Sequence, residues 1–575
     1  MVGIQRLLIA NRGEIAVRII HACRESGVSP VVVVGPGDEG AMHAVLADAS
    51  VTVSSYLDGR ELVAAARELS ADAVHPGYGF LSERAEFAEL VLDAGMRWIG
   101  PPPAAMRRLG DKVEARALAE AAGVPTVPGY AGPDLSDAAL EREAARLGLP
   151  LMIKAAAGGG GRGMRVVDDL SHLREALADA RSESASAFGD DRVFLERRLV
   201  DVRHIEIQVL IDAHGNGVHL GERDCSLQRR HQKIVEEAPS PVVDSELREV
   251  LGTAALAVAR AAGYESAGTA EFLLRDDGSW CFLEMNARLQ VEHPVTEAIT
   301  GLDLVRAQLG IASGEPLGLG QDDVRSRGHA IEARVYAEDP AVGFLPTGGR
   351  VERLALPQWP GVRIDSALRE GDVVGLGYDP LLAKVVVVAE DRAACLARLR
   401  AALAEVLIVG IPTNLGFLLE VLHHPDVVEG RAGTDWVTSV WTTQVPQLPE
   451  GTRPAGDLLD PWTAFGAPRS EPEVVVAGAW AQYRGWAYPV AEDEQAPVVV
   501  PPHDGSLTAP IPAEVARVEV QVGDIVSAGQ VVVMLEAMKM QMRITVSAPG
   551  TVRAVHVRPG DVVVRGQILI EVDPS

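Results

Sequence analysis

Cysteine is scarce in this chain, and long apolar runs are missing from it. The four cysteines among 575 residues lie far apart and form no Cys-x-x-Cys pair. We therefore expect neither a disulfide framework nor a zinc site, and a reducing compartment suits these thiols best. No run of about 18 apolar residues occurs, which argues against a membrane span. The apolar run before Asn11 is also too short for a secretory signal peptide, so we predict a cytoplasmic protein.

Positive charge is also in short supply. Lysine and arginine together number 53 against 80 aspartates and glutamates, so the net charge is −27. Such an acidic surface repels nucleic acid and anionic membranes. Apolar residues at 47% and charged residues at 23% otherwise describe an ordinary globular chain. We predict that neither nucleic acid nor a membrane is a partner, and that any phosphate site lies in a local basic patch.

The length of the chain predicts several domains rather than one core. Over the first hundred residues short apolar runs alternate with helical patterns, which indicates a parallel sheet with crossover helices. Ten prolines among residues 441–502 are typical of a semi-rigid linker. Five of the eight tryptophans lie in or beside this linker, where they either dock a partner or fill a small β core. The predicted boundaries are 1–113, 114–320 and 321–440 for three α/β regions, 441–500 for a linker or partner-docking region, and 501–575 for a small all-β domain.

The C-terminal region contains an internal repeat. Residues 514–536 match residues 551–573 at a constant offset of 37, with apolar residues at alternate positions in both copies. Each copy is too small to bury its own face, so we expect the two to pair into one flattened barrel. Lys539 lies between the copies, at the turn that joins them, and should project into solvent. A lysine on such a turn is accessible to a modifying ligase.

The strongest chemical signal is a pair of acidic residues in a predicted hairpin. The Asp-Gly dipeptide at 277–278 is a preferred two-residue turn. Counting outward from it pairs Arg275 with Trp280, and further out it pairs Glu271 with Glu284. Two facing carboxylates repel unless a cation lies between them, and such oxygen ligands suit Mg²⁺ that bridges nucleotide phosphates. In an extended segment five polar side chains would share one face, where a merely solvated face rarely combines these types; they are Glu284, Asn286, Arg288, Gln290 and Glu292.

Three other segments suit a nucleotide site. The glycine-rich segment 155–167 lacks the Gly-Lys-Ser/Thr of a P-loop, and it indicates a hairpin flap whose backbone N–H groups close over phosphates. Lys154 and two arginines add positive charge there. Segment 204–210 alternates polar and apolar residues as a half-buried strand does, and segment 223–233 is the densest basic patch of the chain. Ordinary surface charge is an equally good interpretation of any single residue in the last two segments.

Together these segments resemble the biotin carboxylase family of ATP-grasp ligases, followed by a biotin carboxyl carrier domain. The motifs stand here as IANRGEIAVR, HPGYGFLSE, KAAAGGGGRGM, RHIEIQV, RDCSLQRRHQK, LEMNARLQVEHPVTE, GHAIEARVYAED and YDPLLAK, and Lys539 lies in an AMKM tetrapeptide. The resemblance implies an α/β and α+β multidomain fold. A Rossmann-like N-terminal domain, an ATP-grasp domain and a biotin carboxylase C-terminal domain would precede a small all-β biotinyl domain, a flattened barrel. One departure is Pro-Ile-Pro-Ala at 510–513, where carrier domains usually have Pro-Met-Pro-Gly.

The resemblance also implies the cofactors and a role for each site residue. Biotin would be attached covalently to Lys539, and Glu271, Glu284 and Asn286 would hold Mg²⁺, or Mn²⁺ in its place. Glu292 would deprotonate bicarbonate, which attacks the γ-phosphoryl group of ATP to give carboxyphosphate, and Arg334 would stabilise the charge that develops on biotin. Bicarbonate would be bound by Lys233, Arg288, Gln290, Val291 and Glu292, of which Lys233 and Arg288 are also catalytic. ATP would be bound by Lys112, Lys154, Gly159, Gly160, Gly161, Glu196, His204, Gln228 and His231, with Lys233 at its phosphates.

Within the family, the likeness is to α subunits of bacterial acyl-CoA carboxylases. Such a subunit implies a separate carboxyltransferase β subunit, a biotin protein ligase, and self-association at positions matched by His21, Glu25 and Arg363. Acetyl-CoA or propionyl-CoA would be the acceptor, with methylcrotonyl-CoA or a longer acyl-CoA as the alternative. Two other interpretations stay open: an ATP-grasp ligase that joins another acid and amine, and a carrier scaffold with an inactive catalytic half.

Overall fold

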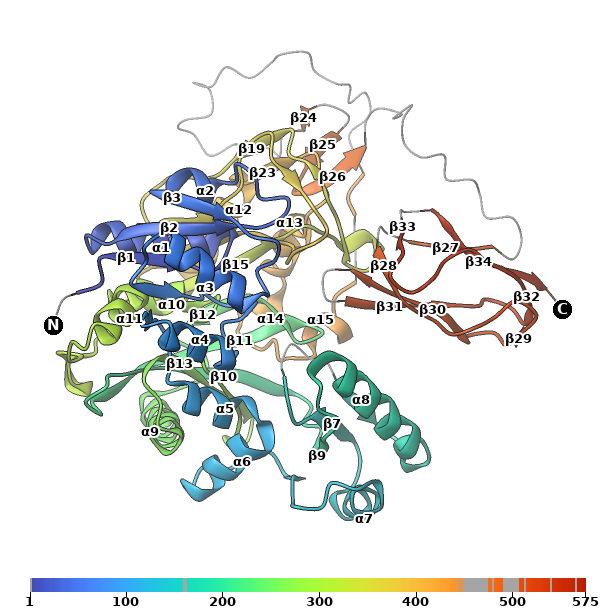
Figure 1. Ribbon diagram of the computed structural model, residues 1–575, viewed down its shortest axis with the longest axis horizontal. Coiled ribbons are helices and arrows are strands. Elements are labelled where there is room, and N and C mark those ends of the chain that lie inside the picture. The colour runs from blue at the N-terminus through green and yellow to red at the C-terminus, as the bar shows by residue number, and fades with distance from the viewer. Residues whose placement is uncertain are drawn as a thin grey trace.

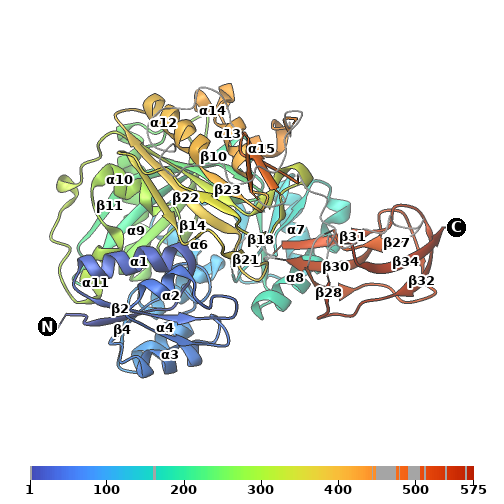
Figure 2. The same cartoon turned by 90° about the horizontal axis from the view of Figure 1, so that it is seen from above.

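The computed structural model consists of a large body and a small β domain that protrudes from one side of it, with the C-terminus at the far end (Figure 1, Figure 2). No helix in the described part of the chain is both long and apolar enough to cross a bilayer. The structure describes residues 3–158, 163–442, 445–447, 474–477, 480–489, 506–510, 513–537, 540–563 and 566–574.

A five-stranded sheet forms the N-terminal part of the body, in the order β3-β2-β1-β4-β5 with every pair parallel. This confirms the parallel sheet predicted for the first hundred residues. Its central strands are continuous apolar runs because helices cover both faces. The first helix packs against this sheet and against strand β20 (Val362–Ser366) of the C-terminal part. The elements are β1 (Arg6–Ile9), α1 (Gly13–Glu25), β2 (Ser29–Val34), α2 (Met42–Leu46), β3 (Ala49–Thr52), α3 (Gly59–Glu68), β4 (Ala73–His75), α4 (Ala85–Asp93), β5 (Arg97–Trp98) and α5 (Pro103–Gly110).

A small four-stranded sheet, in the order β6-β9-β7-β8, follows in the chain. Its strands β7 and β8 pair antiparallel on either side of the glycine-rich segment, as the predicted flap requires. Gly159, Gly160 and Gly161 themselves lie outside the described residues. The elements are α6 (Lys112–Ala121), β6 (Gly129–Tyr130), α7 (Asp137–Leu147), β7 (Leu151–Ala155), β8 (Arg165–Val167), α8 (Leu173–Phe188) and β9 (Val193–Arg197), with a 3-10 turn at Leu170–His172.

The centre of the body is an eight-stranded antiparallel sheet, in the order β14-β13-β10-β11-β12-β15-β22-β20. It continues across residue 320, so residues of the second and third predicted regions share one sheet. Its elements are β10 (Val202–Ile211), β11 (Gly217–Arg229), β12 (Gln232–Ala238), β13 (Ser266–Arg275), β14 (Trp280–Asn286), β15 (His329–Tyr336), β20 (Val362–Ser366) and β22 (Leu381–Ala389), with helices α9 (Ser245–Ala262), α10 (His293–Thr300), α11 (Leu304–Ala312) and α12 (Arg392–Glu405).

The hairpin between β13 and β14 differs in register from the prediction. Leu274, not Arg275, is opposite Trp280, because the loop has three residues: Arg275 N–H donates to the Ser279 carbonyl at 2.9 Å. A one-residue register shift further along the hairpin then restores the pairing of Glu271 with Glu284. The predicted Arg275–Trp280 pair is therefore wrong, and the predicted acid pair is correct.

Residues after 440 include a small sheet that packs on the body. Strands β24 (Val475–Ala477), β25 (Trp480–Tyr483) and β26 (Trp486–Pro489) form it. The Gln482 amide accepts from Ile408 N–H and donates to the Val406 carbonyl, both at 2.9 Å. Trp486 is 4% exposed and lies close to Gly416. Of the five tryptophans in or beside the predicted linker, three thus pack against their own chain: Trp436, Trp441 and Trp486.

The remaining elements of the body are short. Three two-stranded sheets pair β16 with β17, β18 with β21, and β19 with β23. Their bounds are β16 (Glu338–Asp339), β17 (Leu345–Pro346), β18 (Gly349–Arg350), β19 (Arg353–Ala355), β21 (Val373–Val374) and β23 (Leu407–Val409), and the helical segments are Gln321–Asp323, Pro340–Val342, α13 (Leu415–Val421), α14 (Pro425–Val428) and α15 (Trp436–Ser439).

The protruding domain consists of two four-stranded sheets around a buried core of valines and leucines. This is the flattened barrel that the repeat predicts, and each sheet takes strands from both copies. Lys539 lies outside the described residues, between the paired strands β30 and β31. The first sheet contains β27 (Ser506–Thr508), β34 (Ile568–Pro574), β32 (Gly550–Val555) and β29 (Ile525–Val526), and the second contains β31 (Met540–Thr545), β30 (Val531–Ala537), β28 (Ala513–Val518) and β33 (Val562–Val563).

Candidate active site

The centre of the candidate site is the ammonium group of Lys233, on β12. Its Nζ atom lies 2.5 Å from a Glu206 oxygen on β10, 3.0 Å from Glu271 on β13 and 2.7 Å from Glu292 just before α10. The side chain is only 11% exposed. Burial works against its charge, but the three carboxylates outweigh burial and raise the pKa of Lys233 well above its usual value. Three acidic residues distant in sequence are therefore held around one fixed cation.

A buried arginine forms an ion pair with one of the carboxylates of this cluster. Arg223, on β11, is fully buried and forms an ion pair with Glu206, which is also fully buried. The guanidinium donates to Gln208 Oε1 and Thr296 Oγ1 at 2.9 Å. Strand β10 is therefore not half-buried as its alternation predicted: its polar side chains are buried because they form the floor of the site. Buried charges of this kind are stable only when paired and hydrogen-bonded.

Glu271 and Glu284 face each other as predicted, and cations neutralise both. Glu271 lies 3.0 Å from His204 Nε2 and accepts a 2.8 Å hydrogen bond from the Asn286 amide. Burial opposes its charge, but Lys233 and His204 hold the pKa of Glu271 below its usual value. Glu284 forms an ion pair with Lys112 and is 29% exposed.

The donors around this acid pair fit a divalent cation. His204, Glu206 and Glu271 offer ligand atoms within 4.8 Å of one another. Glu206 is already saturated by Arg223 and Lys233, however. The two facing carboxylates and the neighbouring amide oxygen are hard oxygen donors of the type that Mg²⁺ prefers. We therefore regard Glu271, Glu284 and Asn286 as the better ligand set.

The segment after the acid pair is not extended throughout. Strand β14 ends at Asn286, and the chain then turns toward α10. Three of the five predicted polar side chains nevertheless meet, since Arg288 donates to Gln290 Oε1 at 2.7 Å and to Asn286 Oδ1 at 3.2 Å. Gln290 in turn lies 3.4 Å from Glu271. Hydrogen bonds between the side chains, rather than strand geometry, bring them to one place.

Glu292 is held between two cations. It is fully buried, with one oxygen 2.7 Å from Lys233 and the other accepting from Arg334 on β15 at 2.8 Å. Arg334 also lies 2.5 Å from Glu236 on β12. Burial would favour the neutral acid, but Lys233 and Arg334 hold the pKa of Glu292 well below its usual value. The carboxylate is ionised, and its basicity depends on its distances to the Lys233 and Arg334 cations.

The residues predicted to bind ATP lie beside this cluster. Lys112, Lys154, Glu196 and Glu284 line one small hollow, and Lys154 Nζ is 2.5 Å from Glu196 Oε2. Gln228 is buried on β11, in register with Lys233. His231 follows at the exposed turn into β12, where partial burial and the nearby Lys154 lower its pKa. Apart from the three glycines and Lys539, every predicted site residue thus lies in or next to one region of the eight-stranded sheet.

Sequence reasoning missed several charged residues of this region. Glu206 and Arg223 belong to segments 204–210 and 223–233, but neither residue was predicted to take part in the site. The polar alternation of segment 204–210 could have identified Glu206. Glu236 and Glu332 face each other across β12 and β15, and both are fully buried. Burial raises the pKa of Glu236 to about 7 despite its contact with Arg334.

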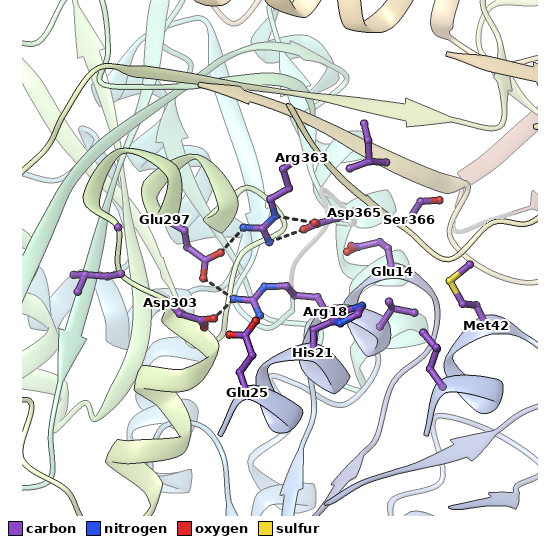
Figure 3. A pocket seen from close by; sticks show the side chains of 15 residues that line it. Glu14, Arg18, His21, Glu25, Met42, Glu297, Asp303, Arg363, Asp365 and Ser366 are labelled. Carbon is purple, nitrogen blue, oxygen red and sulfur yellow. Dashed lines mark hydrogen bonds and ion pairs between the residues drawn. The ribbon is translucent and has the colours of Figure 1, made fainter. Parts of the chain in front are cut away.

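The three residues predicted at a self-association surface lie apart from this cluster. His21, Glu25 and Arg363 line a hollow of about 500 Å³ between α1, α10 and β20 (Figure 3). Its charges are paired: Arg363 lies 2.7 Å from Glu297, and Arg18 lies 2.8 Å from the same residue. The lining contains none of the predicted ATP, metal or bicarbonate residues.

Family models match most of this chain. Residues 3–106 match "Biotin carboxylase, N-terminal domain", and residues 111–319 match "Carbamoyl-phosphate synthase L chain, ATP binding domain". Residues 332–439 match "Biotin carboxylase C-terminal domain", and residues 505–572 match "Biotin-requiring enzyme". These matches confirm the resemblance and the fold class inferred from the sequence.

Individual relatives agree with the family models. A mitochondrial methylcrotonoyl-CoA carboxylase subunit alpha from Dictyostelium discoideum is 46% identical over 441 residues, which cover 76% of this chain and 63% of the relative. A propionyl-CoA carboxylase alpha chain from Ruegeria pomeroyi is 45% identical over 482 residues, covering 79% and 70%. A biotin carboxylase from Nostoc is 47% identical over 438 residues, covering 75% and 98%. The match thus spans a little under two thirds of the Dictyostelium subunit and nearly all of the Nostoc enzyme.

A solved structure shows the same fold. The biotin carboxylase domain of the Hydrogenobacter thermophilus 2-oxoglutarate carboxylase, described as a dimer with MgADP, ADP and bicarbonate, superposes with a TM-score of 0.75 at 41% identity. The alignment covers 76% of this chain and 98% of that domain. By sequence and by structure, the chain belongs to the biotin carboxylase family, and it carries a biotin-lipoyl type domain at its C-terminal end.

Proposed function

We propose that this chain is the α subunit of an acyl-CoA carboxylase. It carboxylates biotin on Lys539 with ATP and bicarbonate, and a separate carboxyltransferase β subunit passes the carboxyl group to an acyl-CoA. The observation that carries the proposal is the Lys233 cluster, in which one ammonium group lies among Glu206, Glu271 and Glu292. The matching biotin carboxylase and biotin-requiring models support the carboxylation of biotin and its carrier.

In this proposal the nucleotide lies over the hollow lined by Lys112 and Lys154. These lysines now pair with Glu284 and Glu196, and both are only partly exposed, at 22% and 14%. Mg²⁺ bound by Glu271, Glu284 and Asn286 would neutralise charge on the phosphoryl oxygens. The hairpin of β7 and β8 would exclude water from the bound phosphates, which protects a labile carboxyphosphate from hydrolysis.

Bicarbonate binding falls to the segment between β14 and α10. Arg288, Gln290 and the Val291 backbone hold the anion, and Glu292 accepts its proton. A carboxylate flanked by Lys233 and Arg334 is a weak base. If Arg334 turned from Glu292 toward a bound biotin, Glu292 would lose one of the cations that lower its pKa and would become a stronger base.

The acyl-CoA and the partner subunit are the finer part of the proposal. We propose acetyl-CoA or propionyl-CoA as the acceptor, and the Ruegeria propionyl-CoA carboxylase alpha chain supports the second. The Dictyostelium relative favours methylcrotonyl-CoA as the alternative. Substrate choice belongs to the carboxyltransferase subunit, because that subunit binds the acyl-CoA.

Three further expectations complete the proposal. A biotin protein ligase modifies Lys539, and the protein works in the cytoplasm. Two copies associate through the face that carries His21, Glu25 and Arg363; the dimeric Hydrogenobacter domain supports the association of two copies. Lys539 is the only lysine after residue 384, so a biotinylated peptide from the C-terminal domain identifies its site without ambiguity.

The decisive experiment omits the acyl-CoA. The full biotinylated chain is incubated with ATP, Mg²⁺ and ¹⁴C-bicarbonate, and acid-labile label on the protein is counted. We expect label on the parent chain, none on Lys539→Ala, and normal label on Arg517→Ala, which removes an exposed cation of the same domain. Absence of label on a parent whose biotinylation is confirmed by mass would contradict the proposal and favour another ATP-grasp ligation.

A further inference from the structure

Lysine is rare in this chain, and one lysine has no role so far. Only five of the 53 basic residues are lysines. Lys112, Lys154 and Lys233 contact the acidic residues of the candidate site, and Lys539 is the proposed biotin site. The fifth is Lys384, within the quoted motif YDPLLAK. In a chain that otherwise uses arginine, a buried lysine suits a position that needs one compact charge.

Lys384 joins segments that are far apart in the sequence. It lies on β22 directly opposite Arg334 of β15, and its side chain is 0% exposed. The ammonium donates to the Val291 carbonyl at 3.0 Å. It also lies 3.3 Å from Glu14 on α1 and 3.4 Å from Asp365 on β20. One side chain thus connects the N-terminal sheet region, the C-terminal strands and the segment between β14 and α10.

The Val291 carbonyl belongs to a segment without regular backbone pairing. Residues 287–292 lie between the end of β14 and the start of α10. The Gln290 and Glu292 carbonyls accept from the backbone N–H groups of His293 and Val295 at 3.3 Å, whereas the Val291 carbonyl accepts from a distant side chain, Lys384. Because a peptide unit is planar, fixing the Val291 carbonyl also fixes the Glu292 N–H and the position of the Glu292 Cα atom, from which the side chain extends. His293 Nδ1 lies 2.7 Å from the neighbouring Gln290 carbonyl, so two consecutive carbonyls are held.

The anchors of Lys384 are themselves fixed. Asp365 accepts two 2.8 Å hydrogen bonds from Arg363, which also contacts Glu297 at 2.7 Å. Figure 3 shows Glu14 and Asp365 on the wall of the hollow beside α1, with Arg363 between Asp365 and Glu297. Lys384 therefore has little freedom to move away from Val291.

We propose that Lys384 is a positioning residue for bicarbonate. By holding the Val291 carbonyl it sets the backbone that binds the anion and the backbone position from which the Glu292 carboxylate reaches into the site. It does not touch substrate itself. This inference rests on the proposed function, since it assigns a purpose to a contact of the proposed bicarbonate segment.

The test replaces Lys384 by methionine in the full biotinylated chain and measures ATP hydrolysis as a function of bicarbonate and of ATP. Loss of a charged hydrogen bond predicts a rise of about tenfold or more in the KM for bicarbonate. The KM for ATP should stay within about twofold, because Lys384 contacts none of the predicted ATP residues that the structure describes. A merely structural role would change both constants together or neither, and either result would overturn the proposal.

Two further variants keep this test decisive. Arg392→Met also removes a cation from a carboxylate, that of the half-buried Glu237, but not from the bicarbonate segment, so its KM for bicarbonate should be normal. Glu14→Gln/Lys384→Met removes one buried charge of each sign, which limits the loss of stability; it should show the same rise in the KM for bicarbonate. A normal value in the double variant refutes the role of Lys384. Absence of bicarbonate-dependent hydrolysis in the parent would instead refute the proposed function.

Discussion

Replacing Arg334 by methionine should separate biotin-dependent turnover from nucleotide binding. The guanidinium is 8% exposed and contacts Glu236 at 2.5 Å and Glu292 at 2.8 Å. Losing one preorganised charge-stabilising group costs about 10²- to 10³-fold in turnover. We expect that loss in biotin-dependent ATP hydrolysis. Nucleotide affinity should change by less than about twofold, because Lys112 and Lys154 pair with other carboxylates than Arg334 does.

The same variant should change the pH dependence. Burial alone would raise the pKa of Glu292, and Arg334 is one of the cations that lower it. Without Arg334 the pKa of Glu292 rises, so the acid limb of bicarbonate-dependent ATP hydrolysis should move to higher pH. Stability should fall by about 3–5 kcal/mol, the usual cost of breaking a buried ion pair from one side.

Three measurements test this reasoning. Nucleotide titration gives the affinity for ADP, steady-state kinetics with and without biotin give the turnover, and a pH series gives the acid limb. The double variant Glu236→Gln/Arg334→Met also removes the Glu236 carboxylate, which Arg334→Met alone would leave without its cation. If the double variant is folded, a loss of its turnover is not explained by misfolding. Equal losses in nucleotide affinity and in biotin-dependent turnover would refute the role assigned to Arg334.

Three other predictions follow from the structure. Burial raises the pKa of Glu14 in the folded protein to about 7 despite the nearby Lys384. The folded state therefore binds more protons than the unfolded state, and stability should fall by about 3 kcal/mol as the pH rises from about 4.5 to about 7. Glu14→Gln should lose this pH dependence of stability in urea unfolding, and an unchanged dependence would contradict the assignment. Trp486→Ala should weaken the packing of β24–β26 on the body by about 3–5 kcal/mol. Limited proteolysis should then cleave these strands faster than in the parent chain, and an unchanged rate of cleavage would contradict this packing. Lys112→Met should raise the KM for ATP by about tenfold or more and leave the KM for bicarbonate near normal; similar shifts in both constants would argue against a nucleotide role.

The acid pair could be predicted from sequence because a hairpin is a local structure. An Asp-Gly turn and a count outward were enough to place Glu271 opposite Glu284. The same count paired Arg275 with the wrong residue, because the loop has three residues rather than the predicted two. A bulge between Phe272 and Glu271 then restores the predicted register at the acid pair. Turn type and bulge depend on packing against the rest of the sheet, which a periodicity in one segment does not contain.

Long-range charge pairing could not be predicted in this way. Glu14 and Lys384 meet only because α1 packs against β20 of the C-terminal part. Arg223 stood in a segment interpreted as a basic patch, yet it is fully buried because β11 is internal to an eight-stranded sheet. Polar alternation in β10 likewise suggested a solvent face. Sequence patterns identify a polar face, but only the assembled sheet decides whether water or other charges cover it.

The interleaved strands of the C-terminal domain have a consequence for synthesis. Strand β28 from the first copy of the repeat pairs with β33 from the second, and β29 pairs with β32. Strand β27, which precedes the first copy, pairs with β34 at the end of the second copy. The first copy therefore cannot form its sheets while the second copy is still inside the ribosome. On the proposed function, the ligase would therefore meet a folded acceptor only after the catalytic body and both copies of the repeat have been translated.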